Sequence, residues 1–173
     1  MHLACSNNEI RPAMSCIYFK DGFAYASDGM ILVKNRISEC STLDEAEIQA
    51  LEGKLLHRDF YKDMIKYDDI LISEEGIECH KNGEKCFFYF STFGEGVKYP
   101  DAEKVLQEAL NKPAVPLPQF AFNMENIQRL NKALYKCERC VATFKGTNQT
   151  IVFDSMDDDV SSIGLFMPCL SQD

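Results

Sequence analysis

Several cysteines have a spacing that is compatible with metal or redox chemistry. Cys137 and Cys140 are separated by two residues, as in half a zinc site or a redox pair. A structural zinc site needs two further ligands, and the remaining candidate set is Cys79-His80 with Cys86. A redox pair is typical of a thioredoxin-like βαβ context, whereas this pair lies between an expected helix end and a strand. We therefore favour buried, reduced thiols and expect no cofactor and no metal.

The carboxylates and histidines form no recognisable catalytic pattern. Asp157, Asp158 and Asp159 are consecutive, so their side chains would spread around a loop and not converge on one metal or proton. The three histidines are far apart in the sequence, at positions 2, 57 and 80. The sequence contains neither a glycine-rich phosphate loop nor a G-x-S-x-G motif. We expect a protein that is not an enzyme.

Two expected helices, at about 57–67 and 124–136, each combine a basic side with an apolar side. Basic residues recur at spacings of three or four, which places them on one side of each helix. A basic side that faces solvent can follow a phosphate backbone, and such binding is independent of sequence and sensitive to salt. The candidate DNA-binding residues are Arg58, Lys62 and Lys66 in the first helix and Arg129, Lys132 and Lys136 in the second.

The alternative is that these are ordinary solvated helix surfaces. Lysine and arginine are common on helix surfaces, and Asp59 and Asp63 would neutralise part of the first basic side. The whole chain is acidic, with 18 Lys and Arg against 27 Asp and Glu and a net charge of -9. That charge opposes indiscriminate binding to nucleic acid or to an anionic membrane, so any contact with DNA must be local.

Turn and helix signals divide the chain into three similar units. Asp21-Gly22 and Asp28-Gly29 lie between β-branched and aromatic runs and predict a three-stranded meander in the first unit. The second unit has the order short strand, helix, then strands, with a hairpin turn at Asn82-Gly83. The third unit repeats this order, with FAFN as its short strand and Asn123 as the N-cap of its helix. The first unit lacks most of its helix.

The segments between these units predict an insert and a boundary. Thr42 and Glu45 are spaced as a capping box, which predicts a short surface helix within an insert over residues 40–53. Prolines at 113, 116 and 118 end regular structure, so we expect a domain of two repeats over 1–112 and a further half-domain repeat over 118–173. The sequence has no 18-residue apolar run and no signal-peptide pattern, so we expect a cytoplasmic protein with reduced cysteines and no membrane partner.

Three stretches of the sequence resemble the bacterial sliding clamp, the β subunit of DNA polymerase III. RPAMSCIYFKDGFAYASDGMILVKN is similar to the clamp motif RPxLxGIxF followed by ATDGHRL. Tyr99, Pro100, Asp101, Lys104 and Val105 are in step with the clamp's FPDYRRVL, and the closing MPCL resembles its MPMRL. The likeness covers nearly the whole chain except residues 40–53 and 107–117. It implies an α+β fold of helix-plus-antiparallel-sheet repeats, with helices lining a ring around duplex DNA and sheets outside.

The resemblance also implies a groove for short linear motifs of polymerases and other replication proteins. The positions carried over from the clamp are Gly29, Met30, Ile31, Leu32, Pro100, Lys104, Val105, Met167, Pro168, Cys169 and Leu170. The clamp's His-Arg pair is Met30-Ile31 here and the Arg of MPMRL is missing, so we expect a changed peptide specificity. The alternative is that Ile31, Leu32 and Met167 are plain core residues and that the groove is closed.

The number of repeats bears on assembly and function. A full clamp chain has six repeats, whereas three are recognisable here, and three cannot close a ring. We expect a homo-oligomer: if a ring holds twelve repeats, four chains would supply them, and the third repeat of each would take a partner repeat from a neighbour. A dimer or a monomer without a ring is equally open. The leading hypothesis is a clamp-like processivity or accessory factor that contacts duplex DNA non-specifically and tethers replication proteins. The alternative is an adaptor that kept the fold and lost DNA binding.

Overall fold

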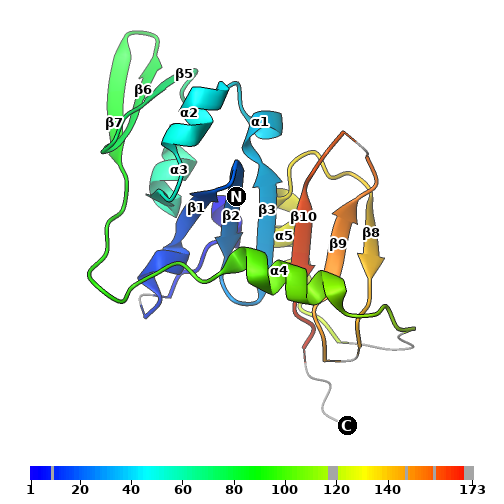
Figure 1. Ribbon diagram of the computed structural model, residues 1–173. Helices are drawn as coiled ribbons and strands as arrows, with labels where there is room; N and C mark the ends of the chain where they lie inside the picture. The colour runs from blue at the N-terminus through cyan, green and yellow to red at the C-terminus, as the bar shows by residue number, and fades with distance from the viewer. Residues whose placement is uncertain (9, 117–120, 147, 158, 170–173) are drawn as a thin grey trace.

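The chain folds around two antiparallel sheets, seen in Figure 1. The computed structural model describes residues 1–8, 10–116, 121–146, 148–157 and 159–169. The larger sheet has seven strands in the order β4-β1-β2-β3-β10-β9-β8, and the smaller has three in the order β5-β6-β7. Helix α4 lies across the front of the larger sheet in Figure 1, and α5 lies behind it.

The first unit is the predicted meander, and its hairpin turns are confirmed. Asp21 and Gly22 have positive φ values of 52° and 76°, and Gly29 has a φ of 92°, a region in which glycine carries no steric penalty. Two short 3-10 helices precede the meander where a full repeat would have its α-helix. The elements are η1 (His2–Ala4), η2 (Pro12–Ser15), β1 (Cys16–Lys20), β2 (Phe23–Ser27) and β3 (Ile31–Arg36).

Helix α1 (Ile37–Cys40) leads into the insert, and the insert itself forms the short helix α2 (Glu45–Ala50). The prediction of a capping box at Thr42 and Glu45 is wrong by two residues. Asp44 caps α2 by accepting a hydrogen bond from the Glu47 backbone N–H at 2.8 Å, and the Glu47 carboxylate accepts one from the Asp44 N–H at 2.8 Å. Both pairs fit the sequence pattern, so the pattern alone could not choose between them.

The second unit has the predicted order of strand, helix and strands. Its elements are β4 (Leu55–His57), α3 (Arg58–Met64), β5 (Asp69–Ile72), β6 (Gly76–Lys81) and β7 (Glu84–Tyr89). Strand β4 leaves the sheet of its own unit and pairs with β1, whereas β5, β6 and β7 form the smaller sheet. Helix α3 ends before the predicted residue 67 because the Asp68 N–H already donates to the His80 carbonyl at 3.3 Å, which draws the chain into the sheet.

Helix α4 (Ala102–Asn111) ends before Pro113, as predicted. The Asp101 carboxylate caps it by accepting from the Lys104 N–H at 3.0 Å. Its buried residues, Ala102, Leu106 and Ala109, pack on one face of the larger sheet. The strand residues beneath them come from the first and third units alike: Tyr25, Leu32, Val152 and Leu165.

The third unit contains α5 (Met124–Ala133), β8 (Cys140–Thr143), β9 (Ile151–Ser155) and β10 (Ile163–Phe166). Strand β10 pairs with β3, so parts 1–112 and 118–173 share one sheet. The division into two domains remains a prediction. The FAFN strand is reduced to an isolated bridge between Ala121 and Cys169, and Phe120 lies outside the described residues.

The main core lies between the larger sheet and the helices on its other face. Ala4, Ile17, Val33 and Phe166 are fully buried there, with Leu130 of α5 packed against them. Within the described chain, no helix is both long and apolar enough to cross a bilayer.

A buried asparagine explains why α5 is shorter than predicted. The Asn35 amide donates to the Ala133 carbonyl at 3.0 Å and accepts from the Ser162 hydroxyl at 3.0 Å and the Tyr135 N–H at 3.4 Å. These bonds use the groups that would otherwise continue the helix. Asn123 caps the other end, as predicted, by accepting from the Glu125 N–H at 2.8 Å.

Candidate peptide groove and basic helix face

A groove of about 230 Å³ lies where β3, β10 and the start of α4 meet. Seven of the eleven positions expected at a peptide groove line it: Gly29, Met30, Ile31, Leu32, Pro100, Val105 and Met167. These residues come from three stretches that are distant in the sequence. Met30, Val105 and Met167 are exposed by 43%, 47% and 38%, so the groove is open to solvent.

The other four expected positions lie elsewhere. Ala102 and Val105 of α4 face the groove, and the turn of the helix places Lys104 on another side. Lys104 is exposed there, and its Nζ lies 4.0 Å from the Glu108 carboxylate. Pro168 is buried and is not part of the lining. Cys169 is exposed and lies in the bridge with Ala121, and Leu170 is outside the described residues.

The turn before β3 sets the shape of the groove rim. One oxygen of the Asp28 carboxylate accepts from the Met30 N–H at 2.8 Å and from the Ile31 N–H at 3.0 Å. This turn exposes Met30 and buries Ile31. The Met30 carbonyl accepts from the Met167 N–H at 2.9 Å, which holds the two methionines side by side where β3 begins and β10 ends. Flexible methionines suit a surface that adapts to its ligand.

Sequence reasoning missed several lining residues. Arg11 and Met14 belong to the RPAM stretch that carries the resemblance, so the motif did contain a signal for them. Thr150 and Leu165 lie at or beside strands, and no motif marks them. Tyr99 also lines the groove; its ring stacks on that of Tyr18 with centroids 5.0 Å apart, and burial raises its pKa well above the ordinary value.

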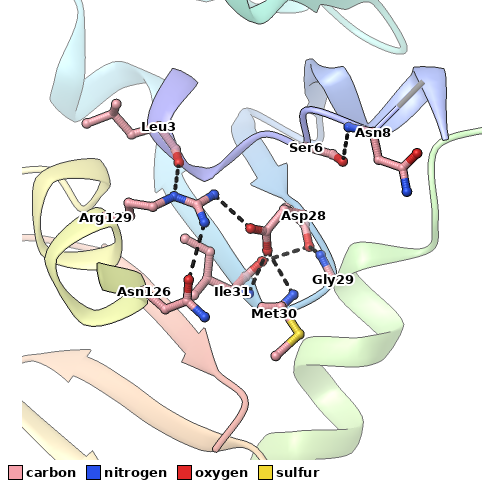
Figure 2. Close-up of polar contacts among 10 residues, drawn as sticks. Leu3, Ser6, Asn8, Asp28, Gly29, Met30, Ile31, Asn126 and Arg129 are labelled. Atoms are coloured by element: carbon pink, nitrogen blue, oxygen red, sulfur yellow. Dashed lines mark hydrogen bonds and ion pairs between the residues drawn. The ribbon is translucent and has the colours of Figure 1, made fainter. Parts of the chain in front are cut away.

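Arg129 lies behind the groove in a network that Figure 2 shows. Its Nη2 is 2.7 Å from the Asp28 Oδ2, its Nε donates to the Leu3 carbonyl at 2.9 Å, and its Nη1 donates to the Asn126 Oδ1 at 3.3 Å. The side chains of Arg129 and Asp28 are only 26% and 14% exposed. The expectation of a free, solvent-facing Arg129 is therefore wrong, because its charge is neutralised by Asp28.

Residues of both basic helices line one depression beside η1. Helix η1 contacts both α3 and α5, and Arg58, Lys62 and Arg129 line one polar depression of about 370 Å³ beside it. His2 lies in the same depression; burial and then the positive charges of the N-terminus, Lys62 and Arg58 lower its pKa. The depression also contains two carboxylates, Asp59 and Glu125.

The stripes are shorter than the sequence suggested. Lys66 follows the end of α3 and forms an ion pair with Asp63, and Lys136 follows the end of α5 at a positive φ of 46°. Lys62 and Lys132 are exposed on the helices themselves. Arg58 is 30% exposed and its Nε lies 3.6 Å from Asp59. We call Arg58, Lys62 and Lys132 the basic helix face.

The two cysteine sets lie on different sheets. Cys79 and Cys86 are opposite each other on β6 and β7, whereas Cys137 and Cys140 lie at the start of the larger sheet's outer strand. All eight cysteines are free, and burial raises the pKa of Cys79 to about 11 and that of Cys137. Cys137 is half-buried and Cys140 is exposed, so the expectation that both thiols are buried is wrong for Cys140 and only partly met for Cys137. No cluster of three metal-binding side chains occurs among the residues with described positions.

The histidines and the acidic run have local structural partners. His57 caps α3 by accepting from the Asp59 N–H at 3.3 Å, and His80 lies 2.7 Å from Glu78. Asp157 pairs with Arg139 at 3.4 Å, and Asp158 is outside the described residues. These contacts lie at the start of α3, within β6 and beside the ends of β8 and β9.

Solved structures of bacterial sliding clamps have the same fold. The beta subunit from the DNA polymerase of Streptococcus pyogenes matches 99% of this chain and 62% of its own, with a TM-score of 0.66 and 14% identity. A DnaN sliding clamp from Bartonella birtlesii bound to griselimycin matches 99% and 62%, with a TM-score of 0.67 and 12% identity. The DNA polymerase III beta chain from Streptococcus pneumoniae matches 99% and 61%, with a TM-score of 0.66 and 13% identity.

These matches confirm the predicted α+β clamp-like fold. The chain spans about three-fifths of the length of the clamps that it matches. No protein-family model matches the sequence, and no curated protein matches it in a sequence search.

Proposed function

We propose that this protein, which has the fold of bacterial sliding clamps, is a clamp-like replication accessory factor and not an enzyme. It binds a short linear motif of a polymerase or another replication protein in the groove. It contacts duplex DNA through the basic helix face. It acts in the cytoplasm.

The observation that carries the proposal is the convergence of three distant stretches on one apolar groove. Three stretches that are far apart in the sequence line a single open groove: Gly29 to Leu32, Pro100 with Val105, and Met167. An apolar groove with a few polar groups is the usual form of a site for short peptides. Among the lining residues that the structure describes, Arg11 alone is charged, so a carboxylate in the bound peptide is favoured at that end.

Peptide binding is tested with a labelled clamp-binding peptide of the polymerase type and fluorescence anisotropy. Val105→Gln removes an apolar contact in the groove and should weaken binding by about tenfold, the loss typical of a central contact. Lys104→Gln is the matched control. Lys104 is next to Val105 in the sequence, but its side chain is not part of the groove lining, so this variant should leave affinity for the peptide unchanged. Equal affinity of both variants, or no binding by the wild type, would contradict the peptide site.

Contact with DNA is supported by the position of the basic helix face. Lys62 and Lys132 are exposed, and Arg58 and Lys62 line the depression beside η1. Their charges would contact phosphates without reading sequence.

A second candidate is a protein-interaction adaptor that binds the peptide and not DNA. It is favoured by the ion pairs that engage Arg129 and Lys66, and by the net charge of -9. Peptide binding together with no detectable affinity for duplex DNA at low salt would select this candidate.

A further inference from the structure

The second and third units share one arrangement of strand, helix and sheet. In the second unit β4 precedes α3, and the Leu55 carbonyl of β4 accepts from the Ser91 N–H at 2.7 Å, just beyond the unit's last strand. In the third unit residues 121–123 precede α5, and the Ala121 carbonyl accepts from the Cys169 N–H at 2.9 Å, again just beyond the last strand. Residues 121–123 are therefore the counterpart of β4.

Strand β4 shows what such a strand does. It pairs along the outer edge of β1, with Ile17 opposite Leu56, and the Phe19 N–H donates to the Lys54 carbonyl at 3.1 Å. Helix α3 follows β4 and contacts β1. Ile17 and Phe19 are consequently buried, at 0% and 5% exposure. One unit thus completes the sheet of another with a strand and a helix.

Strand β8 is the counterpart of β1 at the other end of the sheet. The order β1-β2-β3-β10-β9-β8 is symmetric about its centre, so β8 is the outer strand of the third unit. The Arg139 carbonyl accepts from the Met156 N–H at 3.0 Å, which directs the backbone of Arg139 and Val141 to β9. Successive residues of a strand direct their backbone N–H and C=O groups to opposite edges, so those of Cys140 and Ala142 face the outer edge of β8.

The inner face of β8 is uncovered as well. Ala142 is opposite Phe153, whose ring packs against the main core, so Cys140 and Ala142 lie on the core side of the sheet. Both are nonetheless exposed, unlike Ile17 and Phe19 of β1. Within the described residues, β8 has no strand paired along its edge and no helix over Cys140 and Ala142. Just beyond the strand, the Phe144 carbonyl accepts from the Val115 N–H at 2.9 Å, which leaves the backbone groups of Cys140 and Ala142 as the part of the edge open to pairing.

We propose that a second copy of this chain covers β8. Residues 121–123 of the partner pair with its outer edge, and the partner's α5 lies over Cys140 and Ala142, as β4 and α3 do for β1. The exchange is reciprocal about a two-fold axis, so both uncovered edges are satisfied at once. The strand sequence CVAT has no charge or proline that would block such pairing. This interface does not depend on the proposed binding of peptide or DNA.

The test is the solution mass of the full chain by light scattering, for the wild type and variants of β8. Ala142→Pro removes an N–H that faces outward, so the ladder with β9 is preserved while edge pairing is lost. The wild type should be a dimer or a larger even assembly, and the mass of Ala142→Pro should fall twofold. Ala142→Val keeps the N–H and should retain the wild-type mass. Circular dichroism verifies the fold of each variant.

A second variant covers the case in which the proline variant does not fold. Cys140→Arg places a bulky charge where the partner's helix would lie, and a lone chain tolerates it because Cys140 is exposed. A folded Cys140→Arg with half the wild-type mass supports the interface. A monomeric wild type at all concentrations, or a wild-type mass in both folded variants, would overturn it. Neither outcome involves the groove or DNA, so the proposed function is judged separately.

Discussion

The guanidinium of Arg129 lies 2.7 Å from the carboxylate of Asp28, and this pair joins the basic side of the molecule to the groove. Asp28 uses its other oxygen to hold the turn that exposes Met30. Arg129 also fixes the Leu3 carbonyl of η1. The residue that the sequence pattern assigned to DNA is thus a structural link between α5, η1 and the groove rim.

Replacing Arg129 with methionine should destabilise the fold. The Asp28 carboxylate would remain mostly buried without its partner, and loss of a largely buried ion pair costs roughly 2–4 kcal/mol, less than a fully buried pair because Arg129 is 26% exposed. Lys132→Met, an exposed change on the same helix, should alter the free energy of unfolding by less than about 0.5 kcal/mol. Urea unfolding measures both. Similar stability of the two variants would show that the pair has no structural role.

Glu103 should make stability depend on pH at the acidic end. Burial alone would raise its pKa, but hydrogen bonds from Lys34, Gln107 and Tyr25 outweigh burial and lower the pKa to about 2. A carboxylate with a lowered folded-state pKa stabilises the fold above its unfolded pKa of about 4.3, and the contribution disappears as pH falls toward 2.

The corresponding variant is Glu103→Gln, which keeps the shape and removes the charge. It should lower the free energy of unfolding at pH 7 by roughly 1–3 kcal/mol, the range for hydrogen bonds to a charged group. The difference from the wild type should shrink between about pH 4 and pH 2. Unfolding curves at several pH values test this, and a difference that stays constant with pH would contradict the assignment.

Gly76 should not tolerate a side chain. A Cβ at this position would overlap the Phe88 carbonyl oxygen of the paired strand and lie 2.7 Å from the Phe87 ring. Gly76→Ala should therefore destabilise the protein by about 1–3 kcal/mol, as overpacking does. Gly94→Ala is the control, because nothing lies within 4 Å of its added Cβ. Thermal unfolding that ranks Gly94→Ala as the less stable variant would count against the packing of the smaller sheet.

The elements of the fold were largely predictable because local chemistry specifies them. Asp21-Gly22 and Asn82-Gly83 adopt the positive φ values that tight hairpins require, and Asn123 caps α5. Helix ends were less predictable, because distant residues determine them. Asn35, about a hundred residues away in sequence, terminates α5 before Lys136, and no periodicity in the helix itself reveals that contact.

The candidate sites were predictable to different degrees. Most of the groove followed from motif order, since Gly29 to Leu32, Pro100 with Val105, and Met167 each lie in a stretch that resembles sliding clamps, whereas no motif marks Thr150 and Leu165. The basic stripes followed from helical spacing. Spacing shows on which side of its helix a residue lies, but it does not show which residues of other elements contact that side. Spacing could not reveal that Asp28 meets Arg129, because the two are joined only when β3 and α5 pack around η1.

The most direct test of the account is whether this protein retains a labelled clamp-binding peptide on immobilised duplex DNA. At low salt the wild type should retain the peptide, and retention should fall steeply as salt rises. Lys62→Glu/Lys132→Glu should abolish retention while peptide binding in solution persists, whereas the charge-matched Lys85→Glu/Lys112→Glu, outside the basic helix face, should keep it. Val105→Gln should leave the protein on DNA and weaken retention of the peptide. Peptide binding in solution with no retention on DNA by the wild type would contradict the account.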